Sequence, residues 1–415
     1  MTLSIIIIGD EILLGQVTDT NSGEIARTLG PQGWEVATTQ VVGDSAEAIT
    51  AAVLRAMDAS DLVITTGGLG PTKDDITKLV LAKIFGGEMR EDHEVLENVK
   101  RVFAKRNLQL NKLTCSQAMV PSSCRVIQNR YGTAPVMWFE RDGKVLVSMP
   151  GVPFEAVGML HDVIADEVAR RFSPDKTYLH HTLIASGLPE SALAEKLEPF
   201  EASLPANMHL AYLPQPGYIR LRLDGTFAAS DCDASRVFDE QLQALKAELG
   251  SLLLYDGDAT VAEILLQRLR THGYTVASAE SCTGGNIAHA ITSIAGSSDC
   301  FLGSVVSYSN SVKSGVLGVS QQNLDQYGAV SEQVVRQMAE GARRVIGADC
   351  AMATSGIAGP GGATEGKPVG TVWMAVSTPS GTVAEVKHLP GNRGRVIDRA
   401  TTEVMLMLIR ELDQI

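Results

Sequence analysis

The 415-residue sequence predicts an α/β fold, in which two α/β domains with mainly parallel or mixed sheets are joined by a small α+β module. Three observations support this prediction. Short β-branched runs alternate with helical patterns at both ends of the chain, as in sheets covered by helices. The 39 glycines gather where predicted strands end. At roughly 150 residues per domain, the length predicts two or three domains.

The first domain is predicted over residues 1–171, where strands and helices alternate. The expected strands and helices, in chain order, are 3–8, 22–29, 34–42, 46–57 and 61–66. A second group comprises an amphipathic helix at 91–106, a hairpin of 135–140 and 144–148 that turns at Asp142-Gly143, and a closing helix at 153–171.

A small α+β module is predicted over residues 172–255. Its expected elements are strands at 180–186 and 218–223 and helices at 189–197 and 234–249. A segment of this length is near the lower limit for an independent core, so we expect it to lean on its neighbours. It holds more acidic than basic residues and therefore offers no basic face for nucleic acid.

The second α/β domain is predicted over residues 256–415. Helices are expected at 259–272, 331–346 and 395–412. Strands are expected at 274–279, 301–308, 349–355, 369–377 and 382–388.

Charge and cysteine content exclude several classes of protein. A net charge of −13 disfavours a protein that wraps nucleic acid or lies on an anionic membrane. The six cysteines form no C-x-x-C pair, which indicates reduced thiols rather than a zinc site or disulfides. The apolar run at 3–8 is too short for a secretory signal or a membrane span. We therefore expect a cytoplasmic protein with no membrane partner.

In the first domain, polar clusters follow three predicted strands. Gly67, Gly68 and Gly70 follow one of them, and their backbone N–H groups are suited to phosphate oxygens. Four carboxylates, which could hold a divalent cation bridged to that phosphate, accompany the clusters: Asp10, Glu11, Asp74 and Asp75. The alternative is that Asp74 or Asp75 only caps a helix.

In the last domain, a predicted strand leads directly into Glu280-Ser281-Cys282. A hydroxyl at such a strand-to-helix turn is placed for nucleophilic attack. Lys313, after another strand end, is a general base if burial lowers its pKa, and Tyr308 is placed to orient the pair. The alternatives are that Ser281 is a helix N-cap and Lys313 is solvated.

Further groups point to the same place. Cys282 is either the nucleophile in place of Ser281 or, since it has no adjacent His, a buried small hydrophobe. The strand end Thr354-Ser355-Gly356 opens into a glycine-rich loop that could supply oxyanion donors. Arg393, at a helix start where nothing favours a cation, suggests an anionic ligand.

The segments 7–13, 19–21 and 65–77 resemble the fold of molybdopterin-cofactor biosynthesis proteins and, more closely, the N-terminal half of the CinA family. The resemblance implies a metal-dependent ADP-ribose pyrophosphatase. The molybdopterin enzymes usually carry Arg-Asp where this chain has Asp74-Asp75, and a carboxylate there suits a metal-bridged diphosphate better.

The segments 279–285, 328–331, 355–360 and 367–372 resemble the C-terminal CinA domain, and 187–191 resembles its KH-type insert. The resemblance implies hydrolysis of nicotinamide mononucleotide to nicotinate mononucleotide and ammonia by a Ser–Lys pair, here Ser281 and Lys313, without a cofactor. Thr283 and Tyr308 are expected to assist catalysis. The residues expected to contact substrate are Glu280, Gly284, Gly285, Asn310, Thr354, Ser355, Gly356 and Arg393.

The sequence therefore predicts a bifunctional hydrolase of pyridine-nucleotide recycling that forms a homodimer. Its expected ligands are nicotinamide mononucleotide, ADP-ribose and a divalent cation. Two rival hypotheses are a pterin ligand for the first domain and a binding protein linked to competence or DNA damage. The charge and the lack of a Gly-x-x-Gly clamp in the insert argue against nucleic-acid binding.

Overall fold

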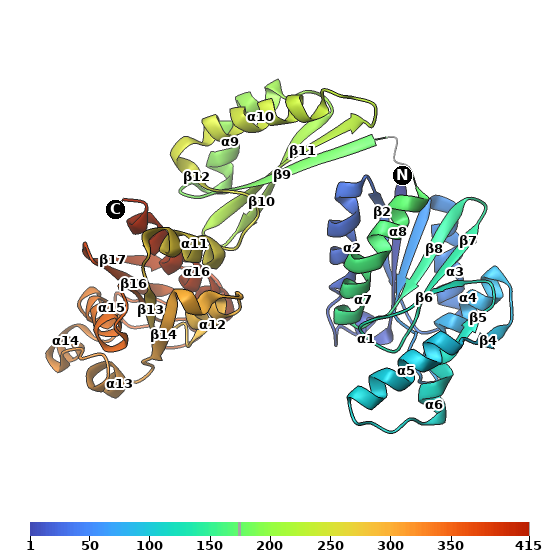
Figure 1. The fold of residues 1–415 in the computed structure, drawn as a ribbon. Helices are drawn as coiled ribbons and strands as arrows, with labels where there is room; N and C mark the ends of the chain where they lie inside the picture. Colours follow the sequence, from blue (N-terminus) through green and yellow to red (C-terminus); the bar gives the residue numbers. More distant parts are fainter. Residues whose placement is uncertain (173–175, 415) are drawn as a thin grey trace. The chain divides into compact units, whose positions relative to one another are not determined.

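The computed structural model describes residues 1–172 and 176–414. The chain divides into two compact units: Met1–His180 with Gly225–Phe238, and His181–Asp224 with Asp239–Ile415. Each unit contains a sheet with helices packed on it (Figure 1). The predicted α/β class with mainly parallel or mixed sheets is confirmed.

The sheet of the first unit has the order β2-β1-β3-β8-β7-β6. Its strands are β1 (Thr2–Ile8), β2 (Glu35–Val42), β3 (Leu62–Thr66), β6 (Arg125–Ile127), β7 (Val136–Arg141) and β8 (Lys144–Met149). The first four strands in this order are parallel, whereas β7 runs antiparallel to β8 and β6 antiparallel to β7. The carboxyl ends of the parallel strands therefore lie at one edge, where ligands bind in open α/β sheets.

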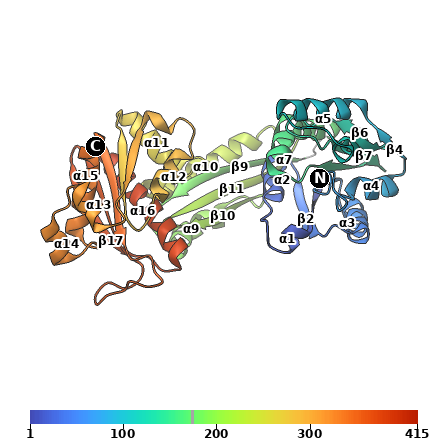
Figure 2. The same cartoon turned by 90° about the horizontal axis from the view of Figure 1, so that it is seen from below.

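Alternation along β1 explains why helices cover both faces of this sheet. Leu3, Ile5 and Ile7 pack with the helices α2 (Asn21–Leu29) and α7 (Pro153–Met159). Ile6 and Ile8 point the other way and pack with α3 (Ala46–Ala59) and α4 (Thr77–Phe85). Figure 2 shows these helices on the two sides of the sheet.

The predicted hairpin forms at Asp142-Gly143, and both residues have positive φ, 52° and 80°. The closing helix 153–171 is interrupted by a π-helical segment, Leu160–Ile164, before α8 (Ala165–Arg171). The amphipathic helix is α5 (His93–Lys105), capped by Asp92. The remaining short elements are α1 (Asp10–Leu13), η1 (Gly30–Gln32), β4 (Met89–Glu91), α6 (Lys112–Cys115), η2 (Ser116–Ala118) and β5 (Met119–Pro121).

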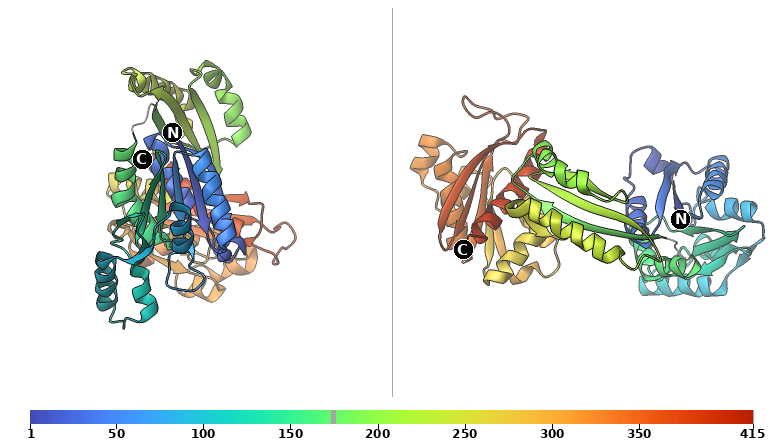
Figure 3. Two further views of the ribbon diagram at one scale, coloured as in Figure 1. Left: turned by 90° about the vertical axis from the view of Figure 1, so that its right-hand side faces the viewer. Right: turned by 90° about the horizontal axis from the view of Figure 1, so that it is seen from above.

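The middle segment forms a four-stranded sheet in the order β10-β11-β9-β12. Its strands are β9 (Lys176–Ala185), β10 (Met208–Gln215), β11 (Tyr218–Ala228) and β12 (Leu253–Asp256). The helices α9 (Glu190–Ser203) and α10 (Ala234–Leu249) lie along this sheet (Figure 3). The link between β10 and β11 lies against the last helix of the chain, since a Cβ at Gly217 would come within 3.1 Å of Glu403 and Leu406. The KH-type assignment stays a prediction.

The sheet of the second unit has the order β14-β13-β15-β16-β17. Its strands are β13 (Val276–Glu280), β14 (Phe301–Val306), β15 (Cys350–Gly356), β16 (Thr371–Thr378) and β17 (Gly381–His388). The first three in this order are parallel, and β16 and β17 are antiparallel additions. β13 is thus flanked by parallel neighbours on both sides.

Helices cover both faces of this sheet as well. α11 (Val261–His272), α12 (Asn286–Thr292) and α16 (Arg393–Leu412) pack on the larger core. On the other face, Ala277, Ala279 and other small strand residues pack against α15 (Glu332–Ile346). The remaining elements are η4 (Gly250–Leu252), η5 (Ser297–Asp299), α13 (Asn310–Gly315) and α14 (Gln321–Tyr327).

Among the described residues, no helix has both the length and the apolar character that crossing a membrane requires. All six cysteines are free.

Candidate functional site

Ser281 lies at the carboxyl end of the central strand β13. Its backbone N–H donates to the Thr354 carbonyl on the neighbouring strand β15 at 3.0 Å. The chain then turns sharply, and Gly284 donates to the Ser281 carbonyl at 3.3 Å. Gly284 and Gly285 have φ of 62° and 105°, conformations that favour glycine. Sheet and turn together fix the position of the serine.

Lys313 reaches Ser281 from the segment that follows β14. It belongs to the short helix α13, whose cap Ser309 accepts a hydrogen bond from Val312 N–H at 3.3 Å. The lysine is only 1% exposed. Its Nζ donates to Ser281 Oγ at 3.0 Å and to the Ser307 carbonyl at 2.6 Å. Burial lowers the pKa of Lys313, which favours the neutral amine that a general base needs.

Glu280 is fully buried and holds the beginning of α12. Its carboxylate oxygens accept hydrogen bonds from the N–H groups of Gly285, Ile287 and Ala288 at 2.9–3.0 Å. These donors would otherwise lack partners at the helix start. The structure thus corrects two expectations. Glu280 is a structural carboxylate rather than a substrate contact, and Ser281 is not an N-cap, because α12 begins at Asn286.

Thr283 and Thr354 lie beneath the turn. Thr283 Oγ1 donates to Glu280 at 2.8 Å and lies 2.8 Å from Thr354 Oγ1, and both threonines are buried. Neither lines the cavity beside Ser281, nor do Gly284 and Gly285. The expected catalytic role of Thr283 and the expected substrate contacts of the other three are therefore corrected to support of the turn.

A cavity of about 210 Å³ opens beside the Ser–Lys pair. It brings together seven of the predicted residues: Ser281, Lys313, Tyr308, Asn310, Ser355, Gly356 and Arg393. Its lining also includes Ala329, Val330 and Ala358, which the sequence did not single out. The first two belong to the 328–331 segment, so that motif was the available signal.

Arg393 stands at the rim of this cavity. Its guanidinium donates to the Gly359 carbonyl at 2.9 Å and to the Tyr308 hydroxyl at 3.1 Å. It makes no ion pair with a carboxylate in the part of the chain that the structure describes. The charge is therefore available to an anionic group of a ligand.

Cys282 lines the cavity, but burial raises the pKa of its thiol to about 11. A thiol with this pKa stays protonated near neutral pH and is a poor nucleophile.

The backbone N–H groups of Cys282 and Thr283 donate to no acceptor among the described residues, whereas that of Gly284 is bonded to Ser281. The residue after a nucleophile commonly supplies an oxyanion donor.

The first unit has a larger cavity, of about 520 Å³, at the carboxyl ends of its strands. Gly67, Gly68 and Gly70 line it as expected. Gly67 has φ of 107°, and a Cβ there would lie 2.0 Å from the Ile8 carbonyl. Only glycine lets the two strand ends come this close.

The predicted carboxylates are placed differently from one another. Glu11, Asp74 and Asp75 line the cavity, but Asp10 does not. Instead, Asp10 and Asp44 exchange backbone-to-carboxylate hydrogen bonds of 2.9 and 3.3 Å. Asp44 lines the cavity and was missed, although it also follows a strand end, β2.

Asp74 and Asp75 precede α4 rather than open it, since the helix begins at Thr77 and has no side-chain cap. Asp75 accepts a hydrogen bond from the Thr72 N–H at 2.9 Å. The alternative that Asp74 or Asp75 caps a helix is therefore corrected. The Asp75 carboxylate instead stabilises the turn of residues 72–75 by accepting the Thr72 N–H.

The carboxylates at this cavity supply oxygen donors of the kind that hard divalent cations bind. Burial raises the pKa of Asp44, and the charges of Asp10, Glu11 and Asp74 raise it further, so the four groups are close enough to interact. Among the described residues, no three His, Cys, Asp or Glu side chains are arranged to hold a metal ion. The oxygen donors fit a hard cation that shares ligand phosphates, as Mg²⁺ commonly does.

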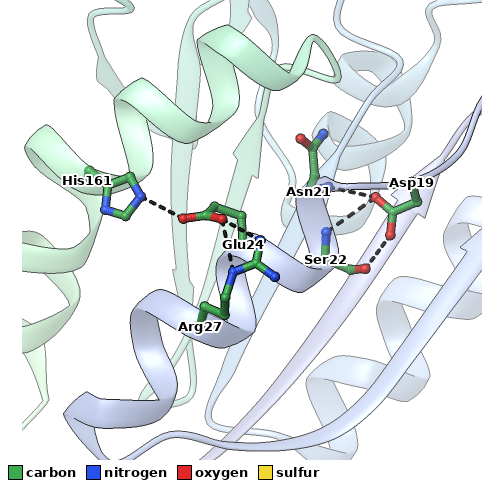
Figure 4. Close-up of polar contacts among 6 residues, drawn as sticks. All are labelled: Asp19, Asn21, Ser22, Glu24, Arg27 and His161. Carbon is green, nitrogen blue, oxygen red and sulfur yellow. Dashed lines mark hydrogen bonds and ion pairs between the residues drawn. The ribbon is translucent and has the colours of Figure 1, made fainter. Parts of the chain in front are cut away.

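Residues 19–21 form another wall of this cavity. Figure 4 shows the polar contacts of Asp19, Asn21 and their neighbours on α2. Asp19 accepts hydrogen bonds from the N–H groups of Asn21 and Ser22 at 2.9 and 3.3 Å. Further along α2, Glu24 contacts both Arg27 and His161, which ties the helix to the Leu160–Ile164 segment. Asn21 Nδ2 donates to Gly151 O at 2.9 Å.

Two buried polar atoms at this cavity have no partner among the described residues, Asn21 Oδ1 and Thr66 Oγ1. An unsatisfied buried polar atom costs free energy, and a ligand hydroxyl or amide would satisfy it. The cavity therefore has the polar groups of a ligand site.

Comparison with known proteins agrees with the two α/β units. Residues 4–170 match the family described as "Probable molybdopterin binding domain", and residues 258–412 match "CinA C-terminal domain". The chain thus combines a molybdopterin-binding-like domain with a CinA C-terminal domain. A CinA-like protein from Cytophaga hutchinsonii is 42% identical over 99% of this chain and 98% of its own length. One from Gemmatimonas aurantiaca is 40% identical over 96% of this chain and 94% of its own length. The chain belongs to the CinA family.

Solved structures of similar proteins cover part of the chain. The competence/damage inducible protein CihA from Agrobacterium tumefaciens is 38% identical and covers 38% of this chain and 99% of its own, with a TM-score of 0.35. The molybdopterin biosynthesis enzyme MoaB from Thermus is 22% identical over 42% of this chain and 98% of its own, with a TM-score of 0.29.

Proposed function

We propose that the second unit hydrolyses the carboxamide of nicotinamide mononucleotide to nicotinate mononucleotide and ammonia. The observation that carries this proposal is the 3.0 Å contact between Lys313 Nζ and Ser281 Oγ inside a cavity. A buried lysine next to a serine hydroxyl is the arrangement of a base and its nucleophile.

In the proposed reaction, neutral Lys313 accepts the Ser281 proton as Oγ bonds to the carboxamide carbon. The C=O π electrons move to the oxygen, which becomes an oxyanion. When that intermediate collapses, the C–N bond breaks and the Lys313 ammonium protonates the departing nitrogen. Water then attacks the ester, with Lys313 again accepting and returning a proton, and the acid product leaves.

The surrounding groups have roles that follow from their positions. The free backbone N–H group of Cys282, a residue that lines the cavity, is suited to the oxyanion. Arg393, whose charge lies at the rim, is suited to the phosphate of the nucleotide. Asn310 and Tyr308 line the space between and would orient the ligand.

Ammonia release from nicotinamide mononucleotide by the purified full chain tests the proposal. Ser281→Ala should lower kcat by at least a thousandfold while ligand binding persists. Cys282→Ala, which changes the adjacent thiol, should keep kcat within a few-fold of the parent. Near-normal turnover of Ser281→Ala together with loss in Cys282→Ala would make the thiol the nucleophile.

We propose as a second activity that the first unit hydrolyses ADP-ribose with a divalent cation. The observation that favours it is the pairing of a glycine turn with carboxylates around one cavity that has unpaired polar atoms. Glu11 and Asp44, which line the cavity, are the residues that would hold the cation together with the phosphates of the ligand. When bound, the cation would neutralise diphosphate charge and activate water. The glycine turn would hold the phosphates.

A chelator should abolish ADP-ribose cleavage and leave ammonia release unchanged, because the amidase residues lie in the other unit. Asp44→Asn should lower cleavage at least a hundredfold, and Asp58→Asn, an exposed aspartate of the same unit, should not. Cleavage that survives chelation contradicts the metal role. Binding of a pterin without any cleavage would favour the pterin hypothesis.

A further inference from the structure

A second cavity of the first unit, of about 480 Å³, is lined mainly by cations. We call it the basic cavity; its charged residues are Arg101, Lys105, Arg106 and Arg130. The first three come from the end of α5 and the residue after it, where a helix C-terminus favours positive charge. Arg130 comes from a separate loop. The helix end therefore does not explain the fourth cation.

These four cations have no carboxylate partner in an ion pair within the described residues. Their neighbour Lys100, in contrast, pairs with Glu97 at 2.7 Å. The chain has 48 acidic residues and 35 basic ones. Four cations without an ion pair are therefore unusual in a chain that has more carboxylates than cations. Gathering like charges around one concavity is unfavourable unless an anion binds between them.

The loop that carries Arg130 is held rigidly. Asn129 is 1% exposed, and its Oδ1 accepts from the N–H groups of Tyr131 and Gly132 at 2.9 and 3.0 Å. From α5, Asn98 Nδ2 donates to the carbonyls of Asn129 and Gly132 at 2.9 and 3.0 Å. The loop is thus fixed to α5, and the backbone positions that carry Arg130 and the cations of α5 are held relative to each other.

The same loop is also a wall of the glycine-rich cavity. Thr133 and Ala134 line that cavity, as does Glu155. Asn129 Nδ2 donates to Glu155 at 2.7 Å, and the charge of Arg106 acts on the Glu155 carboxyl. The loop that follows Asn129 therefore contributes residues to both cavities, Arg130 and Tyr131 to one and Thr133 and Ala134 to the other.

The volume of the basic cavity, about 480 Å³, suits a small anion, whereas a polynucleotide needs an extended basic track. We propose that the basic cavity is a second phosphate site of the first unit, and that the unit prefers nucleoside diphosphate derivatives that carry an additional phosphate. The substrate preference rests on the proposed function, because it needs a diphosphate bound at the glycine turn. The proposal that the basic cavity binds phosphate does not depend on that function.

Calorimetry on the full chain tests this with two probes, ADP-ribose and ADP-ribose 2′-phosphate. The parent protein should bind the second at least tenfold more tightly. Arg101→Gln/Arg130→Gln should lose that difference while its affinity for ADP-ribose stays unchanged. Arg55→Gln/Lys83→Gln removes the same charge from exposed positions of the same unit and should keep the difference.

Equal affinity of the parent for both probes would overturn the proposed preference, as would a difference that persists in Arg101→Gln/Arg130→Gln. If neither probe binds, the diphosphate proposal fails, and a titration with inorganic pyrophosphate decides on the basic cavity alone. An at least tenfold loss of pyrophosphate affinity in the Arg101→Gln/Arg130→Gln variant, absent from the control, supports the phosphate site. Equal affinities, or oligonucleotide binding through these cations in place of pyrophosphate, overturn it.

Discussion

Lys313 and Lys78 are both buried lysines, and burial biases both toward the neutral amine. Lys313 Nζ lies 3.0 Å from Ser281 Oγ, so a lowered pKa suits the proposed role of this lysine as a general base. Lys78 donates to the Gln117 carbonyl at 2.6 Å, and its lowered pKa makes the stability of the first unit depend on pH.

The rate of ammonia release should depend on the protonation state of Lys313. Below its pKa the lysine is protonated and cannot accept the Ser281 proton, so kcat should rise with pH and level off. The midpoint should lie below 10.5, the ordinary lysine value, because burial lowers this pKa. Lys313→Arg should lower kcat at least a hundredfold at every pH while circular dichroism stays unchanged. A flat profile in the parent would argue against lysine as the base.

Lys78 should make the first unit more stable as pH rises. Burial lowers its pKa from 10.5 to about 8. Between these values the unfolded chain binds more protons than the folded one, so the free energy of unfolding increases with pH by up to about 3 kcal/mol. Urea unfolding at pH 8 and pH 10 should show this rise in the parent and not in Lys78→Met. An equal rise in both would exclude Lys78 as its source.

At the scale of elements, α15 packs closely on the segment after α13. A Cβ at Gly341, in the middle of α15, would lie 2.1 Å from the Leu317 carbonyl. That carbonyl also accepts from Arg344 at 2.8 Å. Leu317 follows the short helix α13, which carries Lys313. The absence of a side chain at Gly341 of α15 therefore affects the position of Lys313.

Gly341→Ala should therefore destabilise the second unit by about 1–3 kcal/mol, although alanine normally stabilises a helix by about 1 kcal/mol relative to glycine. It should also lower kcat, because Leu317 must move. Denaturant unfolding and ammonia release measure the two effects. Gly394→Ala, at a helical position with room for a Cβ, is the control for stability and should be neutral or stabilising. Equal stability of the two variants would contradict the packing argument.

Much of the secondary structure could be predicted because local chemistry decides it. The alternation of β1 and the Asp142-Gly143 turn are visible in the sequence. The Ser281–Lys313 pair could be proposed because parallel strands end at one edge of a sheet. The role of Glu280 could not, since a carboxylate beside a nucleophile looks like a site residue until its donors are known. The basic cavity could not be found either, because its cations come from two separated segments.

At the scale of the whole molecule, the division into two units predicts which segments can be deleted without loss of the cavity beside Ser281. The cavity beside Ser281 draws its lining from residues 281–393, all in the second unit. The link between β10 and β11, also in that unit, lies against Glu403 and Leu406 of α16. The middle segment therefore covers part of a helix that the cavity-bearing sheet needs.

A fragment of residues 256–415 should fold and release ammonia from nicotinamide mononucleotide at a rate near that of the full chain. It should unfold at lower denaturant than a fragment of residues 176–415, because α16 loses the contacts with Gly217. Both can be compared by circular dichroism and an ammonia assay. A shorter fragment that is folded but inactive would mean that the middle segment contributes to the site.

The carboxylate of Glu280 also has a consequence for how the nucleophile's turn can be observed. Amide protons in the first turn of a helix usually exchange quickly with solvent, but those of Gly285, Ile287 and Ala288 are bonded to this buried side chain. They should exchange with deuterium only when the turn opens. Their exchange rates therefore time the opening of the Ser281 turn, in the absence of any substrate, and a ligand that closes the cavity should slow all three together.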